Sequence, residues 1–328
     1  MHLLCSLLGM PQRRFASIHV VGTNGKSSVT RMTAALLEAH GVGAGACVSP
    51  HASRWSERVL LHGEEISPAA FSSAVRRTAE AAETVNRSLA NALPPAIRGK
   101  ARSRPERSEE VTQFEVATAT AFVAFAAAGV QAAAVEAGLG GRLDATNTIP
   151  SRVTVLTSIG LDHTDWLGET EVEIATEKLA VLRDHTTLVL GRVSPEVGAL
   201  AREVAAKRGA TLVVAPEDPG EGIELRAAGR FQRRNFALAC AAAEAFLGAL
   251  DPDRVAAVAA SLAVPGRLER IGDDPPVYLD AAHNPDGAAA LAESLPELAA
   301  GRPLVACLAV LADKDAAAMV AALAPALD

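Results

Sequence analysis

The chain has 328 residues, of which 49% are hydrophobic, and a formal net charge of −7. At the usual domain size of about 150 residues, this length predicts two domains with ample apolar content for their cores. The acidic balance and the 3% of aromatic residues disfavour a nucleic-acid-binding protein, which needs a basic surface or stacking platforms.

The predicted compartment is the cytoplasm. No apolar run is long enough for a membrane span, and the N-terminal apolar run lacks the preceding basic residues of a secretory signal. The four cysteines, Cys5, Cys47, Cys240 and Cys307, are scattered and form no C-x-x-C pair. We interpret them as reduced core thiols.

Short apolar runs alternate with longer amphipathic stretches along the chain. This alternation predicts an α/β fold with a largely parallel sheet, helices on both faces and ligands at the carboxyl ends of the strands. The expected strands are 18–21, 45–48, 132–136, 153–158, 187–190, 212–215, 277–279 and 304–310. The expected helices are 28–40, 68–86, 113–128, 171–183, 195–208, 231–247, 252–262, 285–299 and 315–324.

Two segments interrupt the alternation. Residues 87–110 contain adjacent prolines and an Arg- and Ser-rich run, which predicts a mobile surface loop or, alternatively, a basic patch that guides an anionic substrate. Pro265 and Gly266 indicate a hinge between a domain of residues 1–264 and a smaller one of residues 265–328. The smaller domain has room for βαβα, half of a doubly wound sheet, and so looks incomplete.

Residues 17–28, SIHVVGTNGKSS, carry the strongest chemical signal. A buried strand, a glycine-rich turn, a lysine, two hydroxyls and a helix form the arrangement that holds a nucleoside triphosphate. Lys26 adds a positive charge, and Ser27 offers a hydroxyl suited to Mg²⁺. Val20 stands where the first glycine of the usual phosphate-loop pattern is expected. The alternative is an ordinary strand-to-helix turn with a solvated Lys26.

Polar side chains also follow three other predicted strands. Ser49, Glu136 and His163 stand at or just after strands 45–48, 132–136 and 153–158. A carboxylate and an imidazole without a thiol favour Mg²⁺ or Mn²⁺ beside phosphates over structural zinc. The alternatives are a buried ion pair for Glu136 and a capping or core role for His163.

Two further features are ambiguous when taken singly. Lys178 lies on or beside the apolar face of helix 171–183, where a lysine usually keeps its ammonium group in water. Asp280, His283 and Asn284 follow a strand and precede Pro285, which suggests a polar site that faces the first domain. Capping of the next helix by Asn284, with Pro285 at its first position, explains the same pattern, and both interpretations can hold.

With these motifs in order, the chain closely resembles the Mur ligase superfamily and, within it, the folylpolyglutamate synthase and dihydrofolate synthase family. The resemblance covers nearly the whole chain, and GLGGRLDATN with LDHTDWLG is specific to the folate branch. It implies a P-loop Mur-ligase-type ATPase domain with a parallel-rich sheet and a shortened Rossmann-like C-terminal α/β domain. The matching motifs are GTNGKSS; SPH, ERV and GEEIS; EAGLGGRLDATN; SIGLDHTDWLGET and IATEK; PGRLE, DAAHNP and LADKD.

The resemblance implies an ATP-dependent amide ligase that adds L-glutamate to dihydropteroate, folylpolyglutamate or both. ATP would phosphorylate a substrate carboxylate, and the amine of glutamate would attack the acyl phosphate. A monomer that uses ATP, Mg²⁺, carbamylated Lys178 and, as a further option, K⁺ is expected, without nucleic-acid or membrane partners. The alternatives are a ligase for another carboxylate, such as a cell-wall precursor, and a shortened paralogue that binds nucleotide without ligating.

The resemblance also assigns roles to individual residues. Those at the nucleotide are Gly22, Thr23, Asn24, Gly25, Lys26, Ser27, Ser28, Asn235, Arg267, Asp280 and His283. Those at the metal are Ser27, Ser49, Glu136 and His163, and the catalytic set is Lys26, Lys178 and His163. Asp144 matches a pterin-site position.

Three departures from the family pattern are visible. Ser27 replaces a glycine of the folate branch, as in the peptidoglycan ligases, which leaves open whether Ser27 or Ser28 meets Mg²⁺. The family also has residues before the position of His2 and further elements after LADKD. We therefore expect both ends of the chain to be short.

Overall fold

The structure, a computed structural model, describes residues 1–92 and 110–327. Its centre is an eight-stranded sheet with the order β4-β3-β2-β5-β1-β6-β7-β8, in which β2, β5, β1, β6, β7 and β8 run parallel. The strands are β1 (Ala16–Val21), β2 (Ala44–Cys47), β3 (Val59–Leu61), β4 (Glu64–Glu65), β5 (Ala132–Glu136), β6 (Val153–Leu156), β7 (Thr187–Leu190) and β8 (Thr211–Val214).

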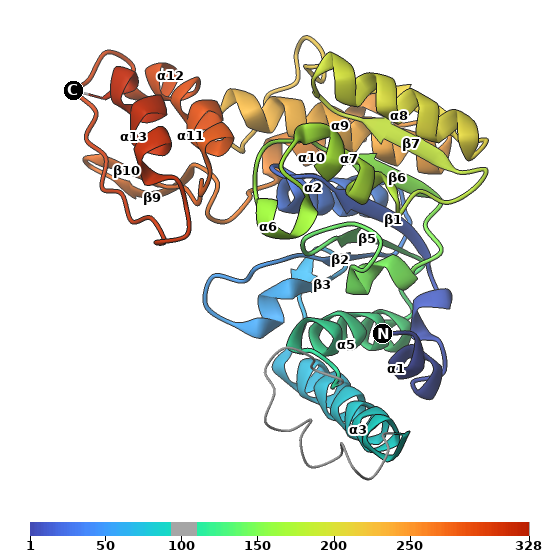
Figure 1. Cartoon of the computed structure of the whole chain (residues 1–328). Coiled ribbons are helices and arrows are strands. Elements are labelled where there is room, and N and C mark those ends of the chain that lie inside the picture. Colours follow the sequence, from blue (N-terminus) through green and yellow to red (C-terminus); the bar gives the residue numbers. More distant parts are fainter. Residues whose placement is uncertain (93–109, 328) are drawn as a thin grey trace.

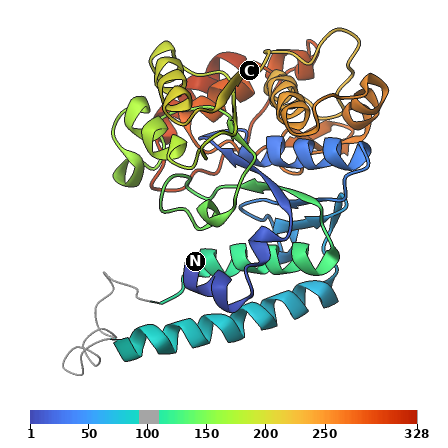
Figure 2. The ribbon, with the colours of Figure 1, turned by 90° about the vertical axis from the view of Figure 1, so that its right-hand side faces the viewer.

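Helices cover both faces of this sheet (Figure 1). The alternating side chains of β5 show why: Ala132 and Ala134 face one core, whereas Ala133 and Val135 face another. The first core is shared with α2 (Lys26–Ala39), α9 (Arg230–Leu247) and α10 (Pro252–Ser261). The opposite face is covered by α1 (His2–Leu7), α5 (Gln113–Ala128), α7 (Glu171–Leu179) and α8 (Pro195–Lys207). Helix α3 (Pro68–Ala92) lies outside α5 as a further layer (Figure 2).

The described part of residues 265–328, which we call the C-terminal unit, forms a small body beside α9 (Figure 1). Its strands β9 (Glu269–Asp273) and β10 (Pro276–Leu279) pair antiparallel. Ala288, Leu295, Met319 and Leu323 form its core. Its helices are α11 (Pro285–Ala292), α12 (Leu295–Ala299) and α13 (Ala316–Leu323).

The predicted α/β architecture with a parallel-rich sheet is confirmed, whereas the predicted strand 304–310 is wrong. Among the described residues, 303–310 form no strand, and Val305 is 86% exposed. An apolar run becomes a strand only when a neighbouring strand pairs with it. In this unit β10 pairs with β9, a strand that the sequence reasoning missed, and the pair is antiparallel where the βαβα prediction required a parallel one.

Three smaller predictions also need correction. The predicted helix 285–299 is divided into α11 and α12, because Pro296 has no N–H with which to continue the helix. Residues 87–92, predicted as loop, belong to α3, while 93–109 lie outside the described residues. Cys307 is exposed, unlike a core thiol, although all four cysteines are free as predicted. None of the described helices is long and apolar enough to cross a membrane.

Candidate active site

The carboxyl ends of the central strands open into a cavity of about 1410 Å³. Its lining includes most of the predicted site residues: Thr23, Asn24, Gly25, Lys26, Ser27, Ser28, Ser49, Glu136, His163, Asn235, Arg267, Asp280 and His283. Lys178 lines a second cavity of about 30 Å³ together with Gly22, Lys26 and His163. Asp144 lines neither of these two cavities.

The turn after β1 has a fixed conformation that is suited to binding phosphate groups. Gly25 has a φ of +85°, and a Cβ there would lie 2.6 Å from Asn235 Oδ1 on α9, so only glycine fits. The Lys26 ammonium donates hydrogen bonds to the carbonyl oxygens of Gly22, at 3.0 Å, and Thr23, at 2.9 Å. It therefore sits over the turn, with its charge at the place where a phosphate loop receives phosphate oxygens.

The two serines at the start of α2 are in different environments. Ser27 Oγ donates a hydrogen bond of 2.9 Å to Glu136 Oε1 at the cavity. Ser28 is buried, and its hydroxyl has no hydrogen-bond partner among the described residues. The geometry therefore places the Ser27 hydroxyl, and not that of Ser28, beside the Glu136 carboxylate.

Glu136, the last residue of β5, is a buried carboxylate with neutral partners. Its oxygens accept from Ser27 Oγ and from the Ser49 backbone N–H, at 2.8 Å. Burial raises the pKa of Glu136, while the nearby Lys26 acts in the opposite direction. None of the described cations forms an ion pair with this carboxylate, so the alternative interpretation of Glu136 as part of a buried ion pair does not hold among them. A desolvated carboxylate of this kind suits an external cation.

His163 faces the same cavities from the segment after β6. It adopts a left-handed conformation, with φ of 53°, at the start of α6 (Thr164–Leu167). Burial lowers its pKa, which keeps the imidazole in its neutral, metal-ligating form. The part of the chain that the structure describes contains no cluster of three or more His, Cys, Asp or Glu side chains that could hold a metal. A metal here would therefore need serine and phosphate oxygens in addition to Glu136 and His163.

Lys178 is buried rather than solvated, because it lies on the side of helix α7 that packs against the turn after β5. Only 3% of the residue is exposed, and its ammonium donates to the Leu139 carbonyl at 2.6 Å. Burial, together with the positive charge of Lys26, lowers the pKa of Lys178 to about 7. A large fraction of this amine is therefore neutral at physiological pH.

Asp144 holds the glycine-rich turn that carries Leu139. One carboxylate oxygen accepts from the Gly140 N–H at 2.9 Å, and the other accepts from the N–H and hydroxyl of Thr146. Phe114, which the sequence reasoning missed, lines the large cavity and packs on Gly138, where a Cβ would lie 2.6 Å from the ring. The only sequence signal for it is an aromatic residue at the start of α5.

The C-terminal unit presents ordered polar loops to the same cavity. The Asp280 carboxylate accepts the N–H groups of Leu268 and Ala282, which fixes the loops on either side of the small sheet. Asn284 caps α11 by accepting from Gly287 N–H at 2.8 Å, with Pro285 at the first helical position as predicted. Its side-chain amide also reaches across to the phosphate loop, so the capping and site interpretations both hold.

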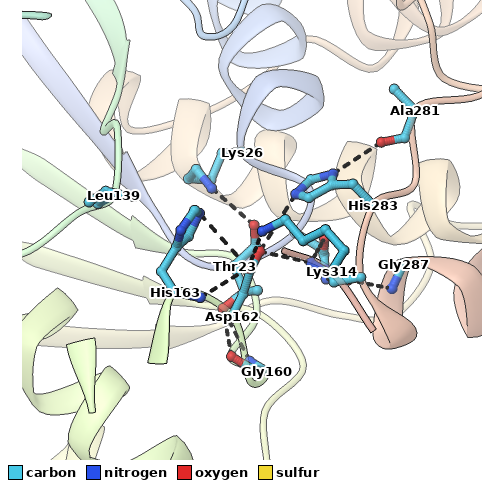
Figure 3. Close-up of polar contacts among 12 residues, drawn as sticks. Thr23, Lys26, Leu139, Gly160, Asp162, His163, Ala281, His283, Gly287 and Lys314 are labelled. Carbon is cyan, nitrogen blue, oxygen red and sulfur yellow. Dashed lines mark hydrogen bonds and ion pairs between the residues drawn. The ribbon is translucent and has the colours of Figure 1, made fainter. Parts of the chain in front are cut away.

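A cluster around Asp162 was not predicted as part of the site (Figure 3). Asp162 Oδ1 lies 2.9 Å from Lys314 Nζ, and Asp162 Oδ2 lies 3.1 Å from Asn284 Nδ2 and 3.6 Å from His283 Nε2. Asp162 belongs to the LDHTD motif and Lys314 to the LADKD motif. A single sequence does not show that these two residues, 152 positions apart, are in contact.

A phosphate loop on the central strand of a parallel sheet, with the C-terminal unit beside the same cavity, is typical of a nucleotide-binding α/β protein. Residues 266–328 match the sequence profile of the Mur ligase, glutamate ligase domain family. The dihydrofolate synthase/folylpolyglutamate synthase of Mycobacterium tuberculosis is 38% identical over 99% of this chain and 71% of its own length. The folylpolyglutamate synthase of Lacticaseibacillus casei is 32% identical over 96% and 76%, respectively.

Solved structures agree with this assignment. The Mycobacterium tuberculosis folylpolyglutamate synthase complexed with ADP has a TM-score of 0.87, with 38% identity, and covers 100% of this chain and 75% of its own. An Escherichia coli protein in complex with DHPP and ADP has a TM-score of 0.83, with 30% identity, over 99% and 76%. The chain belongs to the folylpolyglutamate synthase/dihydrofolate synthase family of ATP-dependent ligases.

Proposed function

We propose that this protein is an ATP-dependent ligase that joins L-glutamate to dihydropteroate, to folylpolyglutamate or to both. The observation that carries the proposal is the convergence of Lys26, Glu136, His163 and Lys178 on adjoining cavities at the carboxyl edge of the sheet. The names of the relatives support the substrate class, and one solved relative is an AMPPCP–folate complex. The large cavity, at about 1410 Å³, has room for a nucleotide and an organic acceptor together.

Phosphoryl transfer to the acceptor carboxylate depends mainly on positioning and charge neutralisation. The N–H groups at the start of α2 bind phosphate oxygens, and Lys26 exchanges the carbonyls of Gly22 and Thr23 for the transferred phosphoryl group. The amine of glutamate then attacks the acyl carbon, phosphate leaves with the bonding electrons of the acyl–oxygen bond, and the amine loses a proton to water.

The metal assignment follows from the desolvated Glu136. Ser27 donates to this carboxylate, Ser49 holds it in place through its N–H, and His163 lines the same large cavity. When bound, Mg²⁺ supplies neutralisation of the phosphate charge. We further propose two domains, residues 1–264 and 265–328, in a cytoplasmic monomer, with K⁺ as an additional cation and Asp144 on the pterin side.

Carbamylation of Lys178 is the modification that this environment supports. The neutral amine attacks CO₂, a carbon–nitrogen bond forms and a proton leaves to water, which gives a carbamate anion. The reaction replaces a repulsion between Lys178 and Lys26 by an attraction, and it removes a buried cation.

The test is phosphate release from ATP by the purified chain with glutamate and either dihydropteroate or tetrahydrofolate. We expect release that depends on both glutamate and the acceptor, with transfer of ¹⁸O from a labelled acceptor carboxylate to phosphate. K26A is the negative control. Release with a cell-wall precursor alone would favour the alternative ligase, and no acceptor-dependent release from a folded sample would contradict ligation.

A further inference from the structure

The side chain of Asp162 lies at the junction between the phosphate loop and the C-terminal unit. It is only 8% exposed, and three of its polar neighbours, His283, Asn284 and Lys314, belong to the C-terminal unit. His163 Nε2, on its own side of the junction, lies 3.9 Å from Oδ1. Most of the groups that compensate this carboxylate are therefore present only while the C-terminal unit is docked.

A second link ties the same unit to the phosphate loop itself. Asn24 Nδ2 donates to Asn284 Oδ1, and Asn284 Nδ2 donates to Asn24 Oδ1, both at 3.1 Å. Asn24 is the residue before Gly25 in the turn that receives phosphates. A change in the conformation of that turn therefore alters the hydrogen bonds of Asn284, the residue that caps the N-terminus of α11.

The charge of Asp162 has a consequence for nucleotide binding. Asp162 lines the 30 Å³ cavity together with Gly22, Thr23 and Lys26, so its carboxylate stands beside the phosphate position. An uncompensated carboxylate there repels a polyphosphate, and its repulsion is only weakly screened because water is largely excluded. Lys314, whose side chain is 12% exposed, is placed to cancel this repulsion. Its other acidic neighbour, Asp313, is 3.7 Å away and exposed.

We propose that Asp162 and Lys314 form an interdomain latch, in which docking of the C-terminal unit neutralises Asp162 and so makes the phosphate loop receptive to nucleotide. The inference rests on the proposed function, because it takes the bound anion to be the triphosphate of ATP. By linkage, the nucleotide in turn favours the docked arrangement. Asp162 is a positioning residue here: it holds Lys314 and His283 at the mouth of the phosphate loop.

The test is the affinity for Mg²⁺–AMPPCP, measured by calorimetry on the full chain. K314M removes the lysine that pairs with Asp162 and leaves only its histidine and amide neighbours, so we expect the Kd to rise about tenfold. D162N removes the repulsion and the latch together, so its Kd should stay within about threefold of the wild type. The double variant D162N/K314M should bind like D162N. An unchanged Kd in K314M, or a double variant as weak as K314M, would overturn the latch.

A matched control is available on the same interface. Arg230 and Glu297 form an ion pair of 2.6 Å between α9 and α12 in which both side chains are more than half exposed. The double variant R230Q/E297Q should leave the AMPPCP affinity unchanged, because exposed pairs contribute little. A loss equal to that of K314M would mean that any interface damage weakens binding, which contradicts the specific latch.

Docking can be followed separately by energy transfer between dyes on the exposed Cys307 and on a cysteine introduced by S72C in α3, in a C240A background. AMPPCP should increase the docked fraction in wild type and clearly less in D162N, which keeps only the Asn24–Asn284 link. Thermal melts of each variant show whether it is folded. Wild-type protein that bound no AMPPCP would contradict the proposed function itself, whereas binding without a Lys314 effect contradicts only the latch.

Discussion

Buried charges without a counter-ion characterise the site at the scale of single residues. Glu136 has a pKa raised by burial, and Lys178 has a pKa lowered by burial to about 7. Neither forms an ion pair with any of the described residues. Such groups destabilise the free protein, and their environment is typical of residues that meet a cation, a phosphate or a modifying group during function.

Replacing Lys178 tests the proposed carbamate. K178A should reduce the rate of phosphate release at least 100-fold, and short carboxylates such as formate or acetate should restore part of it by occupying the carbamate position. The same salts should not rescue K26A, whose defect is in phosphate binding. An active K178A variant without added carboxylate would show that Lys178 has no catalytic role.

His19 in β1 makes a prediction about pH and stability. Its buried imidazole lies 2.8 Å from the Thr146 hydroxyl, and burial lowers its pKa to about 4, partly offset by Asp144. The unfolded chain therefore binds a proton near pH 6.5 that the folded chain does not. Stability is retained above pH 6.5 and is lost as the pH falls, by about 3 kcal/mol at pH 4.

The measurement is urea unfolding of wild type and H19Q between pH 4 and pH 7.5. The difference in unfolding free energy between the two proteins should depend on pH with this sign. H2Q, at an exposed histidine, is the control and should follow the wild type. Parallel curves for wild type and H19Q would mean that the pKa of His19 is the same in the folded and unfolded states.

The residues that the sequence indicated were those with a chemical pattern close to a strand end. Lys26 and Glu136 fall at the cavities because each lies at or after a strand end that a parallel sheet brings to one edge. Lys178 lies in helix α7, and only the family resemblance indicated its role. The choice between Ser27 and Ser28 required coordinates, because one residue on a helix rotates a side chain by about 100°. The coordinates were also needed to identify the residues that contact Asp162.

At the scale of elements, Thr157 and Ser158, directly after β6, form hydrogen bonds to the phosphate loop that we call the clasp. Thr157 Oγ1 donates to the Asn24 carbonyl at 2.6 Å, and Ser158 Oγ accepts from Asn24 N–H at 3.0 Å. Gly22 is required for this contact, since a Cβ there would lie 2.0 Å from Thr157 Oγ1. The loop is therefore held in its phosphate-binding shape by a neighbouring strand as well as by its own glycines.

Two threonines on this strand and its extension provide a matched test. T157V removes the hydrogen bond to Asn24, so we expect the KM for ATP to rise about fivefold to tenfold while the fold is kept. In T154V the lost hydroxyl has no partner among the described residues, so stability should be unchanged or higher and KM the same. Equal kinetic effects of T157V and T154V would exclude the clasp.

Elements with a strong pattern and a partner nearby were predictable, and the others were not. β5 and α5 have the predicted bounds because β5 is a short apolar run, and because Thr112 caps the start of the apolar helix α5 while Gly129 ends it. Residues 303–310 carry an equally apolar run, but β10 takes β9 as its antiparallel neighbour. Strand propensity reflects packing and pairing, which a local window does not contain.

At the scale of the whole molecule, the two parts of the chain differ in the size of their cores. The central sheet is covered on both faces, whereas the core of the C-terminal unit consists of four buried side chains, Ala288, Leu295, Met319 and Leu323. The free energy of local unfolding is lower where fewer apolar side chains are buried. We therefore expect the C-terminal unit to unfold locally far more often than β1 or β5.

Hydrogen exchange checks this expectation. Amides of β9 and β10 should exchange at least 100-fold faster than those of β5, and AMPPCP should slow exchange at the start of α11 through the Asn24–Asn284 contact. Helix α3, which lies away from the site, serves as the internal control and should not respond to nucleotide. Uniform exchange across the chain would mean a single cooperative unit.

The position of β1 in the sheet also determines when this strand can pair during synthesis of the chain. Among the described residues, β1 pairs with β5 and β6 and with no segment nearer in the sequence, so Ala16 meets its partner Ala132 only after another 116 residues have been synthesised. At about 5–20 residues per second, the strand that carries the phosphate loop waits on the order of 10 s with both edges unpaired. Until β5 has been synthesised, the nascent chain therefore exposes an apolar strand with unpaired edges, which is a template for aggregation.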